Sequence, residues 1–163
     1  MQAHQPQVLE SMAAFERGLA RWDTVSRAVK ELAAVAVVVK IGCGWCIDFR
    51  HRESLAHGTP AAKIEAVPVW RTSVLFTGLE RLVLRYAEAM TDTPPNVTDE
   101  LLADLLSHFT KARAVELTAV IAVENQRSRI NAAFGLTSQG FHHHCAAARA
   151  RPHRAEPDDG PSL

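Results

Sequence analysis

The sequence lacks several features that mark particular classes of protein. It carries 18 Lys plus Arg against 18 Asp plus Glu, so no excess of positive charge draws it to nucleic acid or to anionic lipid. Its longest apolar run, Leu32 to Val39, is about eight residues, far below the roughly 20 that a membrane span requires. Patterns typical of β-strands are almost absent. We therefore expect neither a nucleic-acid partner nor a membrane partner.

Cysteine is also scarce. Of the three cysteines, Cys43 and Cys46 stand three apart, and Cys145 lies alone near the end. Three cysteines do not make the disulfide framework of a small secreted domain. The segment Met1 to Val8 has no basic region followed by an apolar stretch, the pattern of a signal peptide. These absences predict a cytoplasmic location.

What is present indicates helices. The 163 residues have the length of one domain, and a hydrophobic fraction of 47% is enough to form a core. Apolar residues recur at helical spacing, and Ser, Thr or Asp stands where most helices should begin. We predict an all-α, single-domain bundle of about seven helices over residues 1–141, and a disordered tail over 142–163. The expected helices run from Val8 to Leu19, from a cap at Asp23 to Gly42, from Cys43 or Trp45 to His57, from Thr59-Pro60 to Pro68, from a capping box at Thr77–Glu80, from Thr98 to His108, and from Thr110 to Gly135.

The pair Cys43-Gly-Trp-Cys46 at the start of a predicted helix is a redox-type arrangement. Free amides at a helix N-terminus stabilise the thiolate, which is the attacking species. The spacing lets one thiol resolve a mixed disulfide or a sulfenic acid formed at the other. Two other interpretations stay open: inert core cysteines, or half of a zinc site. The further zinc ligands would come from His51, His57 and the cluster His142 to Cys145, which is otherwise a solvated run.

The region around this pair resembles a known family. Glu31 stands twelve residues before Cys43, Ile-Asp-Phe follows Cys46, and Gly58 closes the helix. Downstream, Glu116-Leu-Thr-Ala-Val and the pair Asn125 and Asn131, before Ala-Phe-Gly135, resemble a characteristic final helix. This pattern, from about Asp23 to Phe141, is similar to the carboxymuconolactone decarboxylase family, and most of all to its alkylhydroperoxidase D-type branch.

The resemblance implies an all-helical fold that assembles as homo-oligomers, trimers or hexamers. It implies a dithiol that reduces peroxides at the expense of a thiol or dithiol reductant, with no cofactor and no metal. Cys43, Cys46 and Glu31 would be the catalytic residues, with Cys46 attacking the peroxide, Cys43 as its partner and Glu31 relaying protons with a His. Lactone decarboxylation is a second enzymatic possibility, although members with that activity generally do not rely on the Cys pair.

The sequence departs from the family at the relay His, which normally follows the second Cys by four. That position is Arg50, and His51, one residue later, is turned about 100° away around the helix. Arg50 would favour a thiolate at Cys46 but cannot give up a proton, so we expect a reactive thiolate and slow turnover. An ordinary pairing of Arg50 with Glu53 is equally compatible with the spacing. His57 lies farther along the same face.

Two further expectations follow. Glu31 stands among apolar residues, where a carboxylate is costly to bury, so we expect it within one water-mediated hydrogen bond of the dithiol. The structural alternative is a salt bridge to Lys30 or to an Arg. Because of the missing His, a redox sensor or scaffold that has lost turnover is the non-enzymatic alternative.

Overall fold

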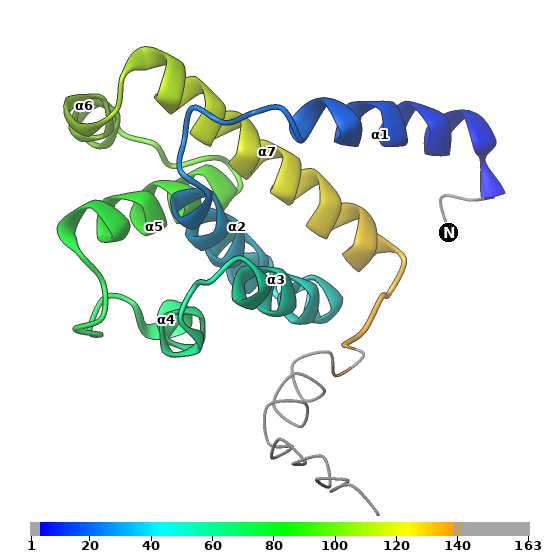
Figure 1. The fold of residues 1–163 in the computed structure, drawn as a ribbon, viewed down its shortest axis with the longest axis horizontal. Coiled ribbons are helices and arrows are strands. Elements are labelled where there is room, and N and C mark those ends of the chain that lie inside the picture. The colour runs from blue at the N-terminus through cyan, green and yellow to red at the C-terminus, as the bar shows by residue number, and fades with distance from the viewer. Residues whose placement is uncertain (1–3, 139, 141–163) are drawn as a thin grey trace, which may run out of the picture.

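The computed structural model describes residues 4–138 and 140. Within them it contains seven α-helices, short 3-10 stretches and no strand, so the prediction of an all-α fold is confirmed (Figure 1). No helix among the described residues combines the length and the apolar character needed to cross a bilayer. The predicted tail, 142–163, lies outside the described residues. The elements are α1 (Pro6–Leu19), α2 (Arg27–Ile41), α3 (Gly44–Ala56), α4 (Ala61–Ala66), η2 (Val67–Val69), α5 (Gly78–Thr91), α6 (Asp99–His108) and α7 (Lys111–Ala133).

Helix α2 is the centre of the fold. Every residue from Glu31 to Val38 is buried, as expected for a helix that is apolar on all sides. It packs against α5, α7 and α3, which surround it (Figure 1). Cys43 and Cys46 lie where α2 ends and α3 begins, and both are buried.

The helix ends follow local rules at most positions. Thr77 and Glu80 form the predicted capping box, and the hydroxyls of Thr98 and Thr110 accept amide hydrogen bonds at the starts of α6 and α7. Gly42 ends α2 with a φ of 77°, a left-handed conformation that favours glycine. One boundary differs slightly: Pro60 is the cap of α4 rather than its first residue.

The predicted cap of α2 is wrong. Asp23 does not begin the helix; Ser26 is the capping position, and its side chain makes no capping hydrogen bond. The reason is a contact across 92 residues: the carboxylate of Glu116, on α7, accepts hydrogen bonds from the Thr24 amide at 2.8 Å and the Val25 amide at 3.3 Å. These bonds hold the segment before α2 against α7, so the helix starts later than its sequence suggests.

The same carboxylate gives the fold a pH-dependent contribution to stability. Burial acts to raise the pKa of Glu116, but hydrogen bonds from the Thr24 hydroxyl, Lys30 and the Thr24 and Val25 amides outweigh it and lower the pKa to about 2. The folded pKa is therefore below the ordinary value of 4.5. The ionised carboxylate stabilises the folded state by about 2 to 3 kcal/mol. This contribution is fully present at pH values above 4.5 and is lost as the pH falls toward 2.

We expect Glu116→Gln to lower the free energy of unfolding by about 2 kcal/mol at pH 7, because the glutamine cannot replace the charged hydrogen bonds. The difference from the wild type should shrink steadily below pH 4.5, since acid removes the same charge from the wild type. Urea unfolding of both proteins between pH 7 and pH 3 measures this. A difference that stays constant over that range would contradict the assignment.

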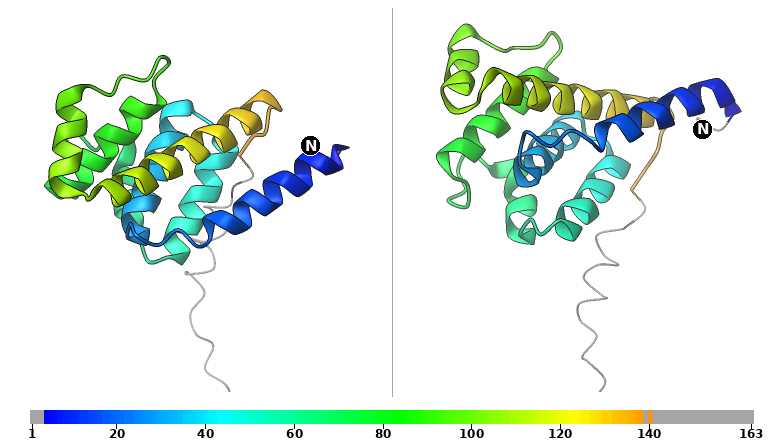
Figure 2. Two further views of the ribbon diagram at one scale, coloured as in Figure 1. Left: turned by 90° about the horizontal axis from the view of Figure 1, so that it is seen from above. Right: turned by 45° about the horizontal axis from the view of Figure 1, so that its top comes forward.

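Helix α1 stands apart from the rest. None of its residues is buried, and it extends outward from the body beside the second half of α7 (Figures 1 and 2). Two side-chain contacts join it to α7: Glu16 pairs with Arg127, and the Gln126 amide lies 3.7 Å from the Met12 sulfur. The helix therefore lies on the outside of the bundle and is held there by few contacts.

Candidate functional site

The cysteine pair occupies the start of α3. Cys43 is the capping residue and Cys46 lies in the first turn, with a Cα–Cα distance of 5.3 Å. The two sulfurs are joined in a disulfide. Both residues are buried, with exposed fractions of 3% and 2%. Among the described residues, no group of three or more His, Cys, Asp or Glu is placed to hold a metal ion; His142 to Cys145 lie outside them.

Local structure explains why the cysteines meet here. Gly42, in its left-handed conformation, ends α2 and reverses the chain. The Cys43 sulfur then accepts a hydrogen bond from the Cys46 amide at 3.4 Å and caps α3. Gly44 lets the backbone at Ser138 lie close to α3, because a Cβ at position 44 would be only 3.3 Å from the Ser138 amide nitrogen. Since both cysteines lie at the start of α3, they are exposed to the partial positive charge of a helix N-terminus.

Cys46 lines a pocket of about 730 Å³, whereas Cys43 is not among its lining residues. Helices α1, α3 and α7 form its walls. The wall from α3 includes the stacked rings of Trp45 and Phe49, whose centroids are 5.3 Å apart. Leu9, Met12 and Ala13 come from α1. The polar lining residues are Glu16, Arg17, Arg50, Glu53, Glu124, Arg127 and Asn131. The pocket that Cys46 lines therefore combines apolar side chains with a group of charged side chains.

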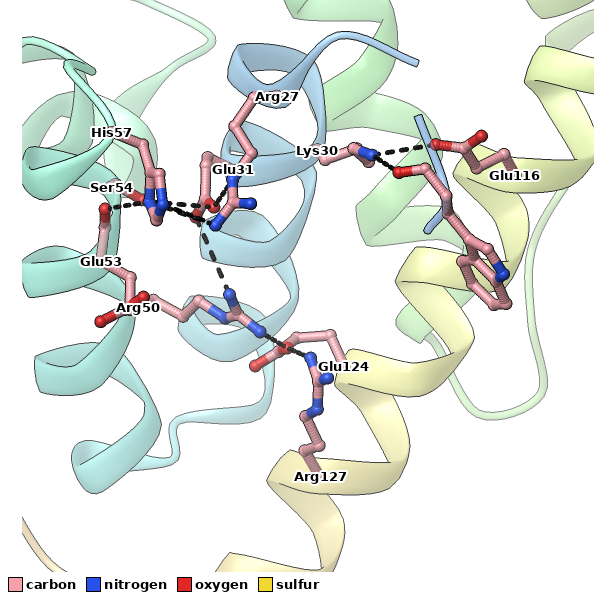
Figure 3. A network of polar contacts seen from close by, with 11 residues as sticks. Arg27, Lys30, Glu31, Arg50, Glu53, Ser54, His57, Glu116, Glu124 and Arg127 are labelled. Carbon is pink, nitrogen blue, oxygen red and sulfur yellow. Dashed lines mark hydrogen bonds and ion pairs between the residues drawn. The ribbon is translucent and has the colours of Figure 1, made fainter. Parts of the chain in front are cut away.

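Arg50 links the two buried carboxylates of the site (Figure 3). Its Nη2 donates to Glu124 Oε2 on α7, and its Nη1 lies 3.8 Å from Glu31 Oε2 on α2. The exposed fractions of Glu31 and Glu124 are only 4% and 3%. The possible pairing of Arg50 with Glu53 is not what the structure shows. Arg50 instead ties α3 to both neighbouring helices.

The side chain of Glu31 is buried, and charged side chains surround its carboxylate. Its carboxylate is 3.0 Å from Arg27 Nε and accepts a hydrogen bond from the Ser54 hydroxyl at 3.1 Å. The alternative of a salt bridge to an Arg is therefore present, whereas Lys30 pairs with Glu116. Glu31 lines a smaller pocket of about 150 Å³ that shares Arg50 with the larger one. Its water-mediated contact with the dithiol stays a prediction.

Neither nearby histidine lines the pocket that contains Cys46. His51 points toward α4, where its Nε2 is 3.9 Å from Glu65 Oε1. His57 ends α3 beside Glu31, with its Nδ1 3.8 Å from the carboxylate. Its Nδ1 donates to the Glu53 carbonyl at 2.7 Å, and its Nε2 accepts from Arg27 at 2.8 Å (Figure 3). His57 is thus the imidazole that approaches Glu31.

The structure adds residues that the sequence did not single out for the site. Arg127 pairs with Glu124 at 3.0 Å and with Glu16, so it connects the buried charges to α1. Burial acts to lower the pKa of Arg127, but these two carboxylates outweigh it and raise the pKa. Asn131, noted only for its place in the final helix, donates from Nδ2 to the Cys46 sulfur at 3.4 Å. No local sequence signal connects α7 to the cysteines.

Comparisons with known proteins agree with this geometry. Residues 6–89 match the carboxymuconolactone decarboxylase family. The chain is 37% identical over 113 residues to the uncharacterized protein YnjA of Escherichia coli (strain K12), over 69% of this chain and 62% of the relative. It is 26% identical to the uncharacterized protein YdfG of Bacillus subtilis (strain 168), over 69% of this chain and 78% of the relative. The chain thus spans less than two thirds of the first relative.

Solved structures show the same fold. A protein of unknown function from Agrobacterium tumefaciens, provisionally described as the antioxidant defence protein AhpD, superposes with a TM-score of 0.75 at 25% identity, over 84% of this chain and 94% of that one. The debrominase Bmp8 superposes with a TM-score of 0.79 at 19% identity, over 88% of this chain and 77% of that one, a likeness of fold alone. With its all-α fold and its Cys43–Cys46 pair, the chain belongs to the carboxymuconolactone decarboxylase family.

Proposed function

We propose that this protein is a dithiol peroxidase that cycles Cys43 and Cys46 between the reduced and disulfide forms. One observation carries the proposal: of the two bonded cysteines, Cys46 lines a pocket of about 730 Å³, whereas Cys43, the capping residue of α3, does not. An attacking thiol must be reachable by its substrate, and a resolving thiol must reach only its partner. The position of Cys46 in the pocket lining therefore supports Cys46 as the attacking thiol and Cys43 as the resolving thiol.

The proposed cycle balances as follows. The Cys46 thiolate attacks the outer oxygen of a hydroperoxide, the O–O bond breaks, and the alkoxide leaves and takes a proton to become an alcohol. Cys46 is then a sulfenic acid. The Cys43 thiolate attacks the Cys46 sulfur, the disulfide forms, and hydroxide leaves and is protonated to water. One external dithiol, or two external thiols, returns two electrons, restores both protein thiols and is itself oxidised to a disulfide.

Glu31 is proposed to relay the protons that the leaving alkoxide and hydroxide take up in this cycle. Its carboxylate is linked to the pocket through Arg50, which lies 3.8 Å from it and lines the pocket beside Cys46. Arg50 contributes a fixed positive charge near the thiolate, although it cannot itself donate a proton. The proposed chemistry requires neither a cofactor nor a metal. A cytoplasmic location and assembly as a trimer or hexamer are parts of the same proposal.

We expect mild peroxide to convert the reduced protein to one carrying a Cys43–Cys46 disulfide, because the two residues are already placed for that bond. Dithiothreitol should restore the thiols, and continuous peroxide consumption should follow when both reagents are present. Peptide mapping by mass spectrometry and a peroxide-consumption assay measure the two results. If both thiols remained free after oxidation, or held a stoichiometric metal ion, the proposed function would be wrong.

A non-turnover redox sensor is the second candidate. The observation that favours it is the state of Arg50, which occupies the relay position and is held between Glu31 and Glu124. Without a proton relay, the Cys pair can still be oxidised by one equivalent of peroxide. The two functions are separated by stoichiometry: a sensor consumes about one peroxide per protein, whereas an enzyme continues as long as dithiothreitol is supplied.

A further inference from the structure

Helix α7 meets α3 at two levels. Glu124 and Asn131 are seven residues apart, two helical turns along one face, and Cys46 and Arg50 are four apart on one face of α3. Glu124 contacts Arg50 at one level, and the Asn131 amide contacts the Cys46 sulfur at the other, 3.4 Å away. Asn131 also lines the pocket that Cys46 faces. An uncharged donor from a distant part of the chain thus reaches the sulfur on its substrate side.

We propose that the Asn131 carboxamide is the hydrogen-bond donor that stabilises the Cys46 thiolate, and that it takes part in both halves of the redox cycle. This inference rests on the proposed function, because it names a third group acting on the reacting sulfur. A hydrogen bond to a charged acceptor is stronger than one to a neutral acceptor, so the amide favours the thiolate over the thiol.

Arg50 does not provide this hydrogen bond. Its Nη2 donates to Glu124, and its Nη1 is directed to Glu31. Its Nε is buried and has no hydrogen-bond partner among the described residues. Arg50 therefore acts on the sulfur only through its charge, which two carboxylates partly cancel. The direct contact from a neighbouring helix is that of Asn131.

The Asn131 amide has a defined role both when the disulfide is reduced and when the thiols are oxidised. When a reducing thiolate in the pocket attacks the Cys46 sulfur, a new S–S bond forms there, the Cys43–Cys46 bond breaks, and its electron pair leaves on the Cys43 sulfur. A second reducing thiolate then attacks the outer sulfur of this mixed disulfide, and Cys46 leaves as the thiolate that Asn131 stabilises. When the reduced protein meets a peroxide, the same hydrogen bond keeps Cys46 ionised and ready to attack. The side chain therefore acts on Cys46, rather than on Cys43, both when this sulfur attacks and when it leaves the mixed disulfide.

An amide also differs from a histidine in its pH dependence, because it does not titrate. The charged groups that face the pocket are Glu16 and Arg17 on α1, Arg50 and Glu53 on α3, and Glu124 and Arg127 on α7. None of these is an imidazole. Between pH 6 and pH 9, the reactivity of Cys46 should therefore follow one ionisation, that of the thiol itself.

The test uses the 163-residue chain carrying Cys43→Ser and Cys145→Ser, in which Cys46 is the one remaining cysteine. The rate of alkylation by iodoacetamide is measured from pH 5 to pH 10. We expect Asn131→Leu to raise the apparent pKa of Cys46 by about one unit and to slow alkylation at pH 6.5 about fivefold to tenfold. Asn131→His should restore fast alkylation at low pH and add a second ionisation to the profile.

Asn125→Leu is the matched control. It lies on the same helix but bonds to Thr91 Oγ1 at 3.0 Å and to the Ile121 carbonyl, away from the sulfur. It should lower stability without moving the alkylation profile. Asn131→Asp, which keeps the shape of the side chain, should raise the apparent pKa at least as much as leucine does, because a carboxylate cannot donate and repels the thiolate.

Profiles of both Asn131→Leu and Asn131→Asp that coincide with the parent would overturn the inference. Should the leucine variant not fold, as judged by circular dichroism, the aspartate variant decides alone. The measurement needs no peroxide, so it is independent of turnover. A wild-type protein that fails to consume peroxide would refute the proposed peroxidase, whereas the role of Asn131 would be judged on alkylation alone.

Discussion

Replacing Cys46 with serine is expected to reduce peroxide turnover by about a thousandfold or more, to the level of the uncatalysed reaction. The reason is that a serine hydroxyl is not ionised near neutral pH and cannot replace the thiolate as the nucleophile that faces the pocket. The Cys43→Ser variant should behave differently. It keeps the attacking sulfur, so a single oxidation of Cys46 to the sulfenic acid should still occur, without continued turnover. Peroxide consumption and mass spectrometry distinguish the two outcomes.

Cys145→Ser provides the control for that experiment, since it removes the third cysteine and leaves the pair intact. Its turnover should match that of the wild type. The assignment of roles would be reversed if Cys43→Ser abolished the first oxidation and Cys46→Ser retained it. Such a result would make the helix-capping sulfur, rather than the sulfur facing the pocket, the one that attacks.

Replacing Arg50 with methionine is expected to lower the free energy of unfolding by about 3 kcal/mol. Glu31 and Glu124 are buried, and each would lose one positive partner. The figure is at the lower end for a broken buried ion pair, because Glu31 keeps Arg27 and Glu124 keeps Arg127. Urea unfolding at pH 7 measures the change, which should lower the midpoint by roughly 1 to 3 M.

Two variants control for that effect. Lys40→Met breaks an exposed ion pair with Asp92, 2.8 Å long, and should cost less than about 1 kcal/mol. Combining Arg50→Met with Glu124→Gln removes one of the two buried negative charges that have lost Arg50, so the double variant should be more stable than Arg50→Met alone. A loss in Arg50→Met no larger than that in Lys40→Met would mean that water reaches the buried carboxylates freely.

The elements whose ends depend on neighbouring residues could be predicted from the sequence. Thr77, Thr98 and Thr110 each cap the helix that follows, because the cap and the amide it satisfies are only three residues apart. The left-handed glycine at 42 is equally local. The disulfide belongs to the same class, since Cys43 and Cys46 are brought together by one helical turn. Each of these features depends on residues only a few positions apart in the sequence.

The contacts that complete the site could not be predicted in this way. Glu124 reaches Arg50 across 74 residues, and Asn131 reaches Cys46 across 85. In sequence, Glu124 is an ordinary charged residue of a long helix, and nothing near it points to an arginine on α3. The start of α2 was misplaced for the same reason, because Glu116 holds the preceding segment from 92 residues away. Such pairs depend on how the helices pack, which local patterns do not encode.

Two of the three helices that line the pocket differ in how freely their side chains can change. Trp45 and Phe49 stand on α3, close to the buried charges, so substitutions there disturb the folded core. Leu9, Met12 and Ala13 stand on α1, which contributes no buried residue. New side chains on α1 would alter the shape of the pocket at little cost in stability. Descendants of this chain could therefore acquire different substrates by changing their first helix, while the dithiol and the core that positions it stay the same.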